Sequence, residues 1–349
     1  MTNLYVIIPG EISDNLSKMV QAATSEIPTI TITSSTTLPD LKNKKILFAL
    51  ELNSMGYDIP MLQVFSQLYA RGKDALLGSS AGIFIHSKSE LYTKSTAKNI
   101  IFLANQLGCS FIGHPIVEAT KNLNNFRTWQ KRYPLPLEEI CYRLCKKLVK
   151  RLIDDNPKLI QNPKILALHS SSRKTSNTLM LWDMVKDHLR IKEIEELHVE
   201  NGTVLDCAGC SFTACTHFSE QNSCFYGGIM VKEILPTIEK ANAIIWLCPN
   251  YNDSISANLM AVINRLTSLY RKISLYDKTL FSIVVSGNSG SDSVAKQLID
   301  ALNINKGFRL PPYFTLMATA NDPKTVKNIP MIEEAAKQFA TNLMQEMKS

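Results

Sequence analysis

The sequence predicts an α/β fold built on doubly wound parallel sheets, and two observations support this prediction. Short continuous apolar runs alternate with amphipathic helical patterns, which is typical of strands that are buried on both faces of a parallel sheet. A polar stretch at 154–164, with two prolines and no apolar periodicity, divides the 349 residues into two parts. We therefore expect two tandem domains, residues 1–155 and 156–349.

The second part shows the alternation of strand and helix most clearly. Its apolar strand candidates are KILALHS at 164–170, NAIIWLCP at 242–249 and KTLFSIVVSGN at 278–288. Another helical pattern, at 227–241, contains Pro236, near which we expect the helix to be interrupted or kinked. A polar loop follows each of the three strands. Because ligands of such sheets bind at the carboxyl ends of the strands, beside the point where the strand order reverses, we expect the binding site at these loops.

The first part reads as a shortened copy of the second. With a shift of 198 residues, the segment 45–70 aligns without a gap with 243–268, and Ile46 then meets Ile244. Strand, loop and helix follow in the same order in both segments, which predicts an internal duplication. The alternative is a chance alignment of similar patterns.

The loop SSSRKTSNT at 170–178 lies between a predicted strand and a predicted helix. Hydroxyl and amide donors, together with the backbone N–H groups of a helix start, favour an anion, and Arg173 supplies a positive charge. The loop matches neither the GxxxxGK[ST] nor the GxGxxG pattern. It therefore favours one terminal phosphate monoester, and the alternative is an ordinary polar turn with a helix cap.

Three loops together resemble the NAD(P)H-dependent FMN reductase family, which includes the iron–sulfur flavoproteins. SSSRKTSNT resembles the phosphate signature of that family, with Ser170 where glycine is usual. CPNYNDSISANLMAVINRL at 248–266 resembles its second loop and the helix that follows, and SGNSGSDS at 286–293 resembles its Gly-rich loop. The resemblance implies a flavodoxin-like fold, with the first domain a degenerate copy. It implies that FMN contacts Ser170, Ser171, Arg173, Ser176, Asn177, Thr178, Pro249, Asn250, Tyr251, Asn252, Ser254, Ser286, Gly287 and Gly290.

The resemblance also implies the reaction. An FMN-dependent NAD(P)H oxidoreductase passes hydride from a nicotinamide to the flavin and then reduces a quinone, a free flavin, a nitro or azo compound, or a metal ion. The sequence singles out no catalytic acid or base. The alternative function is a non-enzymatic electron carrier between protein partners; such flavodoxins are typically acidic, whereas this chain has a net charge of +7.

Four cysteines form a C-x2-C-x4-C-x8-C run between the first and second strand candidates of the second part. They are Cys207, Cys210, Cys215 and Cys224. Thiolates at such spacing ligate iron–sulfur clusters or zinc. The iron–sulfur relatives carry a cysteine run here, although the spacing after Cys210 departs from their compact pattern. Three interpretations stay open: an oxygen-sensitive [4Fe–4S] cluster, zinc, and free thiols near the flavin edge.

The first domain carries acidic residues where the second would hold a phosphate. Its first loop contains Glu11 and Asp14, and Glu51 stands where Pro249 stands in the second domain. Because carboxylates repel a phosphate dianion, we expect no flavin in the first domain. The fused copy could instead supply the wall that a dimer partner gives in relatives. We therefore expect either a monomer with dimer-like pairing of its domains or a homodimer.

Composition limits the remaining classes of function. Basic residues are scattered, with no basic stripe interleaved with aromatic side chains, so we expect no nucleic-acid partner. No apolar run is long enough to span a bilayer, and the start of the chain does not read as a signal peptide, so we expect a cytoplasmic protein without a membrane partner. The expected partner is a small-molecule electron acceptor.

Overall fold

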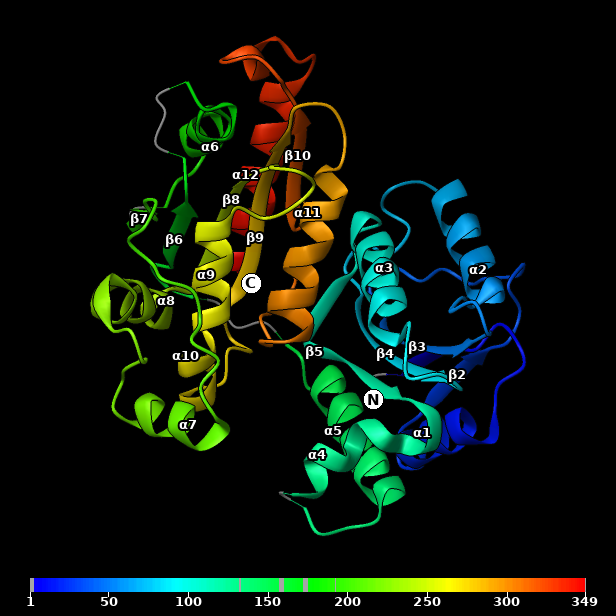
Figure 1. Ribbon diagram of the computed structural model, residues 1–349. Helices are drawn as coiled ribbons and strands as arrows, with labels where there is room; N and C mark the ends of the chain where they lie inside the picture. Colours follow the sequence, from blue (N-terminus) through cyan, green and yellow to red (C-terminus); the bar gives the residue numbers. More distant parts are fainter. Residues whose placement is uncertain (1–2, 132, 157–159, 172–174, 192, 349) are drawn as a thin grey trace. The chain divides into compact units, whose positions relative to one another are not determined.

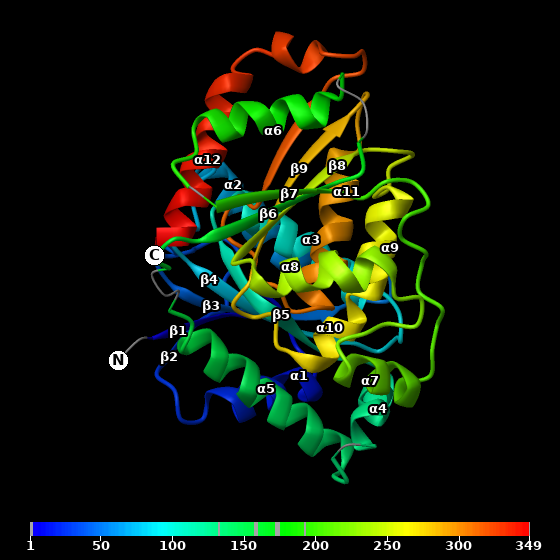
Figure 2. The ribbon, with the colours of Figure 1, turned by 90° about the vertical axis from the view of Figure 1, so that its left-hand side faces the viewer.

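The computed structural model describes residues 3–131, 133–156, 160–171, 175–191 and 193–348. The chain divides into two compact units, residues 1–156 and 157–349, and each is described by itself. Each unit contains one five-stranded parallel sheet with helices on both faces (Figures 1 and 2). Among the described helices, none is long and apolar enough to cross a membrane.

The sheet of the first unit has the strand order β2-β1-β3-β4-β5. Its strands are β1 Leu4–Ile7, β2 Thr29–Ile32, β3 Lys45–Leu52, β4 Ser80–Ser87 and β5 Ser110–Ala119. Its helices are α1 Asp14–Thr24, α2 Ile59–Ala70, α3 Thr93–Gln106, the 3₁₀ turn η1 Lys121–Phe126, α4 Arg127–Gln130 and α5 Leu137–Ile153. In the register of the sheet, Glu51 of β3 lies beside His86 of β4.

The sheet of the second unit has the strand order β10-β9-β8-β6-β7. Its strands are β6 Lys164–His169, β7 Glu193–His198, β8 Ala243–Pro249, β9 Thr279–Ser286 and β10 Thr315–Thr319. Its helices are α6 Asn177–Asp187, α7 Phe212–Glu220, α8 Leu235–Lys240, α9 Ala257–Arg265, α10 Thr267–Lys272, α11 Ser291–Leu298 and α12 Ile332–Lys348. Shorter helical turns are η2 Met230–Ile234, η3 Ile299–Ile304 and η4 Thr325–Asn328. In this sheet, Pro249 lies beside Val285, at the position that Glu51 and His86 take in the first unit.

Both units have the same topology when their strands are numbered in chain order, namely 2-1-3-4-5. This is the order of the flavodoxin-like doubly wound fold, so the predicted fold class is confirmed. Corresponding helices also begin 198 residues apart, since α2 starts at Ile59 and α9 at Ala257. The same spacing relates the residues before α3 and α11, Tyr92 and Gly290, which are both left-handed, with φ of 77° and 85°.

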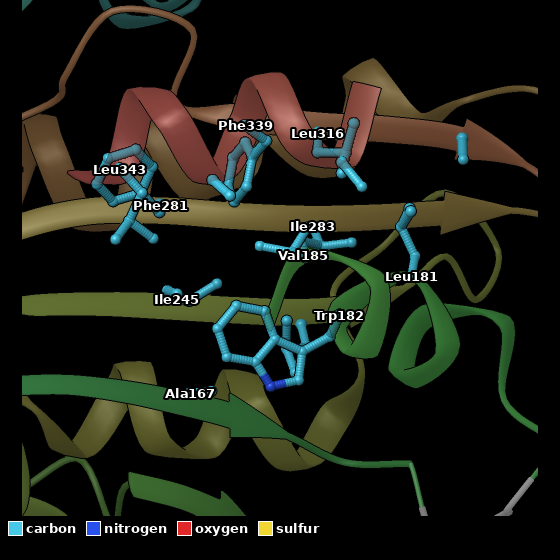
Figure 3. Close-up of a cluster of buried hydrophobic side chains, with 14 of the residues drawn as sticks. Ala167, Leu181, Trp182, Val185, Ile245, Phe281, Ile283, Leu316, Phe339 and Leu343 are labelled. Carbon is cyan, nitrogen blue, oxygen red and sulfur yellow. The ribbon is translucent and has the colours of Figure 1, made fainter. Parts of the chain in front are cut away.

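A hydrophobic core lies between the second sheet and helices α6 and α12. Trp182 of α6 and Phe339 and Leu343 of α12 face Ile245 and Phe281 of the sheet (Figure 3). Phe281 and Phe339 meet edge to face, with ring centroids 5.6 Å apart. This is a favoured geometry for aromatic pairs. The core holds β6, β8 and β9 in place, and with them the loops at their carboxyl ends.

A buried asparagine closes the opposite, amino-terminal edge of each sheet. Asn105, in the last turns of α3, donates to the carbonyl of Cys109 just before β5, at 3.0 Å. Asn303 donates to the carbonyl of Phe308 at 2.7 Å, between η3 and β10. Both side chains are fully buried and lie 198 residues apart. Each amide therefore satisfies a backbone carbonyl at the turn that leads into the last strand.

Candidate functional site

The candidate site lies at the carboxyl edge of the second sheet, where β6 pairs with β7 on one side and with β8 on the other. The connections leave β6 and β8 in opposite directions there, which opens a crevice in folds of this kind. Ser170, directly after β6, and Ser256, directly before α9, join the two loops, because their Oγ atoms lie 2.7 Å apart. The loops after β6 and β8 therefore meet as the sequence predicts, through a residue, Ser256, that the prediction did not include.

The predicted phosphate loop follows β6. Ser171 is buried, and Thr178 is buried in the first turn of α6. Ser176 caps this helix, since its Oγ accepts the N–H of Leu179 at 3.4 Å. Arg173 lies outside the described residues. The start of a capped helix presents unpaired N–H groups and the positive end of its dipole, which suits an anion.

The side chain of Asn177, a predicted FMN contact, forms hydrogen bonds with the segment after β10. Its amide nitrogen donates to the carbonyls of Ala320 and Asp322, at 3.1 and 2.8 Å. Its amide oxygen accepts the N–H of Val326 at 3.2 Å. The side chain thus fastens the segment after β10 to the start of α6, next to the predicted phosphate loop.

Two stacked imidazoles lie at the ends of β6 and β7. The rings of His169 and His198 are 4.7 Å apart and almost parallel. His169 Nδ1 donates to the carbonyl of Ser171 at 3.0 Å. Burial, and then the neighbouring His198, lower the pKa of His169. A neutral His169 therefore supports the backbone of the phosphate loop.

The loop after β8 is a tight hairpin with Asn252 and Asp253 at its tip. Both are left-handed, with φ of 54° and 55°, and Tyr251 and Ser254 pair across them. Two successive residues with positive φ are typical of a type I′ turn, which asparagine and aspartate tolerate. Tyr251 is 56% exposed, so its ring is available to a ligand at this edge. The backbone of Ser254, by contrast, closes the hairpin.

Asn250 connects the second loop to the third. Its backbone N–H donates to the carbonyl of Val285 at 2.9 Å, which continues the sheet beyond Pro249. Its amide nitrogen lies 3.0 Å from Ser286 Oγ and 3.1 Å from the carbonyl of Ser289. Its amide oxygen is buried and has no hydrogen-bond partner among the described residues. Since buried acceptors are rarely left unpaired, this oxygen fits a ligand with an N–H donor, such as a flavin ring.

Glycine is required at the third loop. Gly290 has φ of +85°, and a Cβ at this position would lie 2.0 Å from the Asp253 carboxylate. Ser286 is buried, and its Oγ contacts Ser291 Oγ at 2.7 Å. A Cβ on Gly287 would lie 2.9 Å from Asn321 Oδ1. The third loop therefore packs against the second at Gly290 and against the segment after β10 at Gly287.

An open hollow of about 730 Å³ lies between the third loop and the segment after β10. Its polar side is formed by 288–292, and its apolar side by 317–319 and 329–332. Ligand sites typically have volumes of ~300–1,000 Å³ and combine an apolar wall with a few polar groups. The hollow therefore offers space for a small molecule beside the loop that contains Gly290.

The four cysteines of the C-x2-C-x4-C-x8-C run are not brought together. Among the described residues, no three or more His, Cys, Asp or Glu side chains form a group that could hold a metal ion. Cys215 Sγ instead accepts the Nε–H of Arg271 at 3.2 Å, and Cys224 Sγ that of Arg265 at 3.4 Å. In this arrangement Cys207, Cys210, Cys215 and Cys224 do not form a ligand set for a [4Fe–4S] cluster or zinc.

The corresponding edge of the first unit contains a closed hydrogen-bond network. Glu51 Oε2 accepts the N–H of Ser13 at 3.0 Å and its hydroxyl at 2.7 Å. Glu51 Oε1 lies 2.6 Å from His86 Nδ1, and these two side chains are 16% and 5% exposed. Asn15 Nδ2 lies 3.4 Å from His86 Nε2. A carboxylate of the protein itself thus lies at the start of α1, where a phosphate would have to bind.

Sequence reasoning missed several residues of the candidate site. Ser256 and Asp253 belong to the matched loop and carry the signals of a helix cap and of a type I′ turn. His169 and His198 stack across two strands, and no pattern within one strand predicts such a contact. The contact of Asn177 with Val326 joins segments that are 149 residues apart, so it depends on the fold.

The strand order defines a flavodoxin-like α/β protein, and these loops form a candidate ligand site in its second unit. Residues 163–322, a little under half of the chain, match the family of NADPH-dependent FMN reductases. The matched range includes every residue that was predicted to contact FMN. A comparison with curated proteins finds no match.

Solved structures similar to this chain include three flavin-related proteins. RosB, with bound 8-demethyl-8-formylriboflavin-5′-phosphate, is 14% identical over 53% of this chain and 79% of its own, with a TM-score of 0.40. An NAD(P)H:quinone oxidoreductase from Methanothermobacter marburgensis is 13% identical over 52% and 100%, with a TM-score of 0.39. An FMN-dependent NADH-azoreductase from Bacillus anthracis, in complex with FMN, is 13% identical over 54% and 100%, with a TM-score of 0.36. Because these TM-scores are low, we assign the fold from the strand order of the chain itself and not from the similar structures.

Proposed function

We propose that the second unit binds FMN and acts as an NAD(P)H-dependent flavin oxidoreductase. The observation that carries this proposal is the family match over 163–322, which spans the three loops that meet at one edge of the sheet. When bound, the flavin would supply the electron-transfer chemistry between the nicotinamide and the acceptor. The chain's own part is to bind and orient the two reactants. The acceptor that we propose is a quinone, a free flavin, or a nitro or azo compound.

The described residues suggest which part of FMN each loop would contact. Ser170, Ser171 and the start of α6 would hold the phosphate through hydroxyl and backbone donors. The unpaired amide oxygen of Asn250 would accept an N–H of the ring. Gly290 would keep the third loop close to the second. Asn177 would act through the position of α6 rather than by touching the phosphate.

We further infer that the two units arose by duplication and that the first binds no flavin. The shared strand order and the shift of 198 residues between α2 and α9 support the duplication. The network of Ser13, Glu51 and His86 supports the loss of binding, because it places an anion where the phosphate of FMN would lie. The full chain should therefore bind one FMN.

The test uses the full chain, purified without oxygen and incubated with excess FMN. Flavin absorption bands that remain with the protein after gel filtration, at one FMN per chain, would support the site. Oxidation of NADH or NADPH should then depend on bound FMN and on an added acceptor such as menadione. Bound FMN without steady-state oxidation would instead favour an electron carrier, and the lack of any bound FMN would refute the proposal.

A matched pair of variants separates the site from general stability. Asn250→Ala removes the amide at the carboxyl end of β8, and we expect FMN affinity to fall roughly tenfold, the equivalent of one or two lost hydrogen bonds. Asn242→Ala makes the same change at the amino end of that strand, where the side chain accepts the N–H of Lys164 at 2.9 Å. Its FMN affinity should change less than about twofold. Equal losses in both variants would contradict the role of Asn250.

A further inference from the structure

The hollow of about 730 Å³ shares one loop with the candidate flavin site. Residues 288–292 of the third loop form its polar side, and 317–319, 329–332 and Ala335 form the rest. Asn250 contacts the same loop, since its amide nitrogen lies 3.1 Å from the carbonyl of Ser289. The described residues of the first and second loops do not line the hollow. The hollow is therefore a space of its own beside the candidate flavin site.

A tight turn forms the apolar rim of the hollow. The N–H of Ile332 donates to the carbonyl of Ile329 at 3.2 Å, with Pro330 and Met331 between them. Met331 is left-handed, with φ of 60°. Proline followed by a residue with positive φ is the pattern of a type II turn, whose third position normally holds glycine or asparagine. Met331 therefore occupies a place where the backbone favours other residues.

The side chain of Met331 is disfavoured in a second way, because it is 74% exposed although it is apolar. Ile332, the next residue, is buried in the core, so the fold fixes where the turn lies. Left-handed residues other than glycine cost free energy, and such strain gathers at ligand sites. The flexible thioether of methionine also adapts to ligands and favours contact with aromatic rings. These properties point to a ligand that covers Met331.

The charge around the hollow disfavours an anion. Among the described residues that line it, Asp292 is the one charged side chain, and it pairs with Lys296 at 2.8 Å. The hydrogen bond from Lys296 lowers the pKa of Asp292, so the carboxylate stays ionised at neutral pH. A carboxylate repels an anionic ligand, and one that is already paired attracts a cation only weakly. The hollow therefore suits an uncharged molecule.

We propose that the hollow is a binding site for an uncharged, mainly apolar molecule of two or three aromatic rings. Its volume lies within the ~300–1,000 Å³ that is typical of ligand sites. Ile329, Met331 and Ala335 would contact the rings, and the hydroxyl groups of Ser289 and Thr319 would face a polar atom at the ring edge. The ligand binds without a covalent step, and the site needs no bound flavin.

The test uses the full chain and two probes with the same rings. N-phenyl-1-naphthylamine is uncharged, and 8-anilino-1-naphthalenesulfonate adds one sulfonate. Both fluoresce on binding to an apolar site, and equilibrium dialysis gives their Kd. We expect the uncharged probe to bind roughly fivefold tighter or more, because the sulfonate meets the carboxylate of Asp292. Asp292→Asn should narrow this difference roughly threefold. Saturating FMN should not displace the uncharged probe.

Matched variants locate the uncharged probe. Met331→Asn removes the apolar rim but suits a left-handed turn position, so Kd should rise roughly fivefold while Tm does not fall. The control is Lys324→Asn, since Lys324 is also exposed and left-handed, with φ of 66°, but does not line the hollow. Its Kd should change less than about twofold. Ala335→Phe places a ring in the hollow and should weaken binding at least tenfold.

Several results would overturn the proposal. The uncharged probe could fail to bind, or it could bind with the same Kd in Met331→Asn and Ala335→Phe as in the wild type. Lys324→Asn could lose as much affinity as Met331→Asn, and the sulfonate could bind as tightly as the uncharged probe. Displacement by FMN would place the probe in the flavin site. A chain that binds no FMN would refute the proposed function alone, because the variants still decide whether the hollow holds the probe.

Discussion

The network at Ser13, Glu51 and His86 predicts that Glu51→Gln destabilises the first unit. The wild-type carboxylate accepts hydrogen bonds from the backbone and hydroxyl of Ser13, and its other oxygen contacts His86 at 2.6 Å. A glutamine of the same size has one acceptor oxygen and one NH₂ group. An NH₂ group that faces Ser13 opposes the backbone N–H of that residue, and one that faces His86 forces the imidazole into the tautomer in which Nδ1 accepts. The change removes both the charge and part of the hydrogen bonding, and it creates no cavity.

The expected magnitude follows from these contacts. A hydrogen bond to a charged group contributes about 1.5–3 kcal/mol, and a buried donor left unpaired costs about 1–3 kcal/mol. Glu51 is 16% exposed on its side chain, so water can relieve part of the loss. We therefore expect the free energy of unfolding of the first unit to fall by about 3 kcal/mol. For a unit of this size, that corresponds to a drop in Tm of roughly 6–12 °C.

The pH dependence provides a second check on the same variant. Burial would raise the pKa of Glu51, but the hydrogen bonds from His86 and Ser13 outweigh it, so the pKa is lowered. A carboxyl group with a lowered pKa stabilises the folded state above its unfolded pKa, and this stability is lost as the pH falls through the folded pKa. The difference between wild type and Glu51→Gln should therefore be largest at neutral pH and shrink in acid.

The assay is hydrogen exchange measured by mass spectrometry, which assigns the loss to a unit. Peptides from β3 and β4 should exchange faster in Glu51→Gln, whereas peptides from β8 and β9 should not change. As a control, Glu11→Gln removes an exposed carboxylate from the loop that contains Ser13, and it should alter the free energy of unfolding by less than about 0.5 kcal/mol. A loss below about 1 kcal/mol for Glu51→Gln, or an equal loss at every pH, would refute the reasoning.

Three further predictions concern the second unit. Trp182→Ala empties a fully buried core position, so the free energy of unfolding in urea should fall by about 3–5 kcal/mol. Gly290→Ala places a Cβ 2.0 Å from Asp253 Oδ1 at φ of +85°, so FMN affinity in a fluorescence titration should fall roughly tenfold. The lowered pKa of His169 means that its unfolded form binds the proton more tightly, so wild-type stability should fall as pH drops through about 6.5. His169→Gln should remove this part of the pH dependence in urea unfolding.

The strands that the sequence predicted are those with long apolar runs. NAIIWLCP contains β8, and KTLFSIVVSGN contains β9. The helical pattern is interrupted near Pro236, since the π-helical turn Met230–Ile234 ends directly before α8, which has Pro236 in its first turn. Buried parallel strands carry their signal in local composition, so these elements could be read without the fold.

The elements that were missed have weak local signals. β10 is five residues long, TLMAT, and it is defined by its pairing with β9. α7 lies in the cysteine run, where spacing suggested a metal site, although the structure does not bring those thiols together. In the candidate site, the three loops could be predicted because each follows a strand. The role of Asn177 could not, since its partners come from a segment more than 140 residues away.

The matching amides of Asn105 and Asn303 have a consequence for how such a chain can change over time. Each fastens its unit at the end of the sheet remote from the loops. The contacts that stabilise the fold and the loops of the candidate site therefore lie at opposite ends of the strands. If the two units are copies, as we propose, substitutions at the loop end can abolish ligand binding in one unit without loss of its fold.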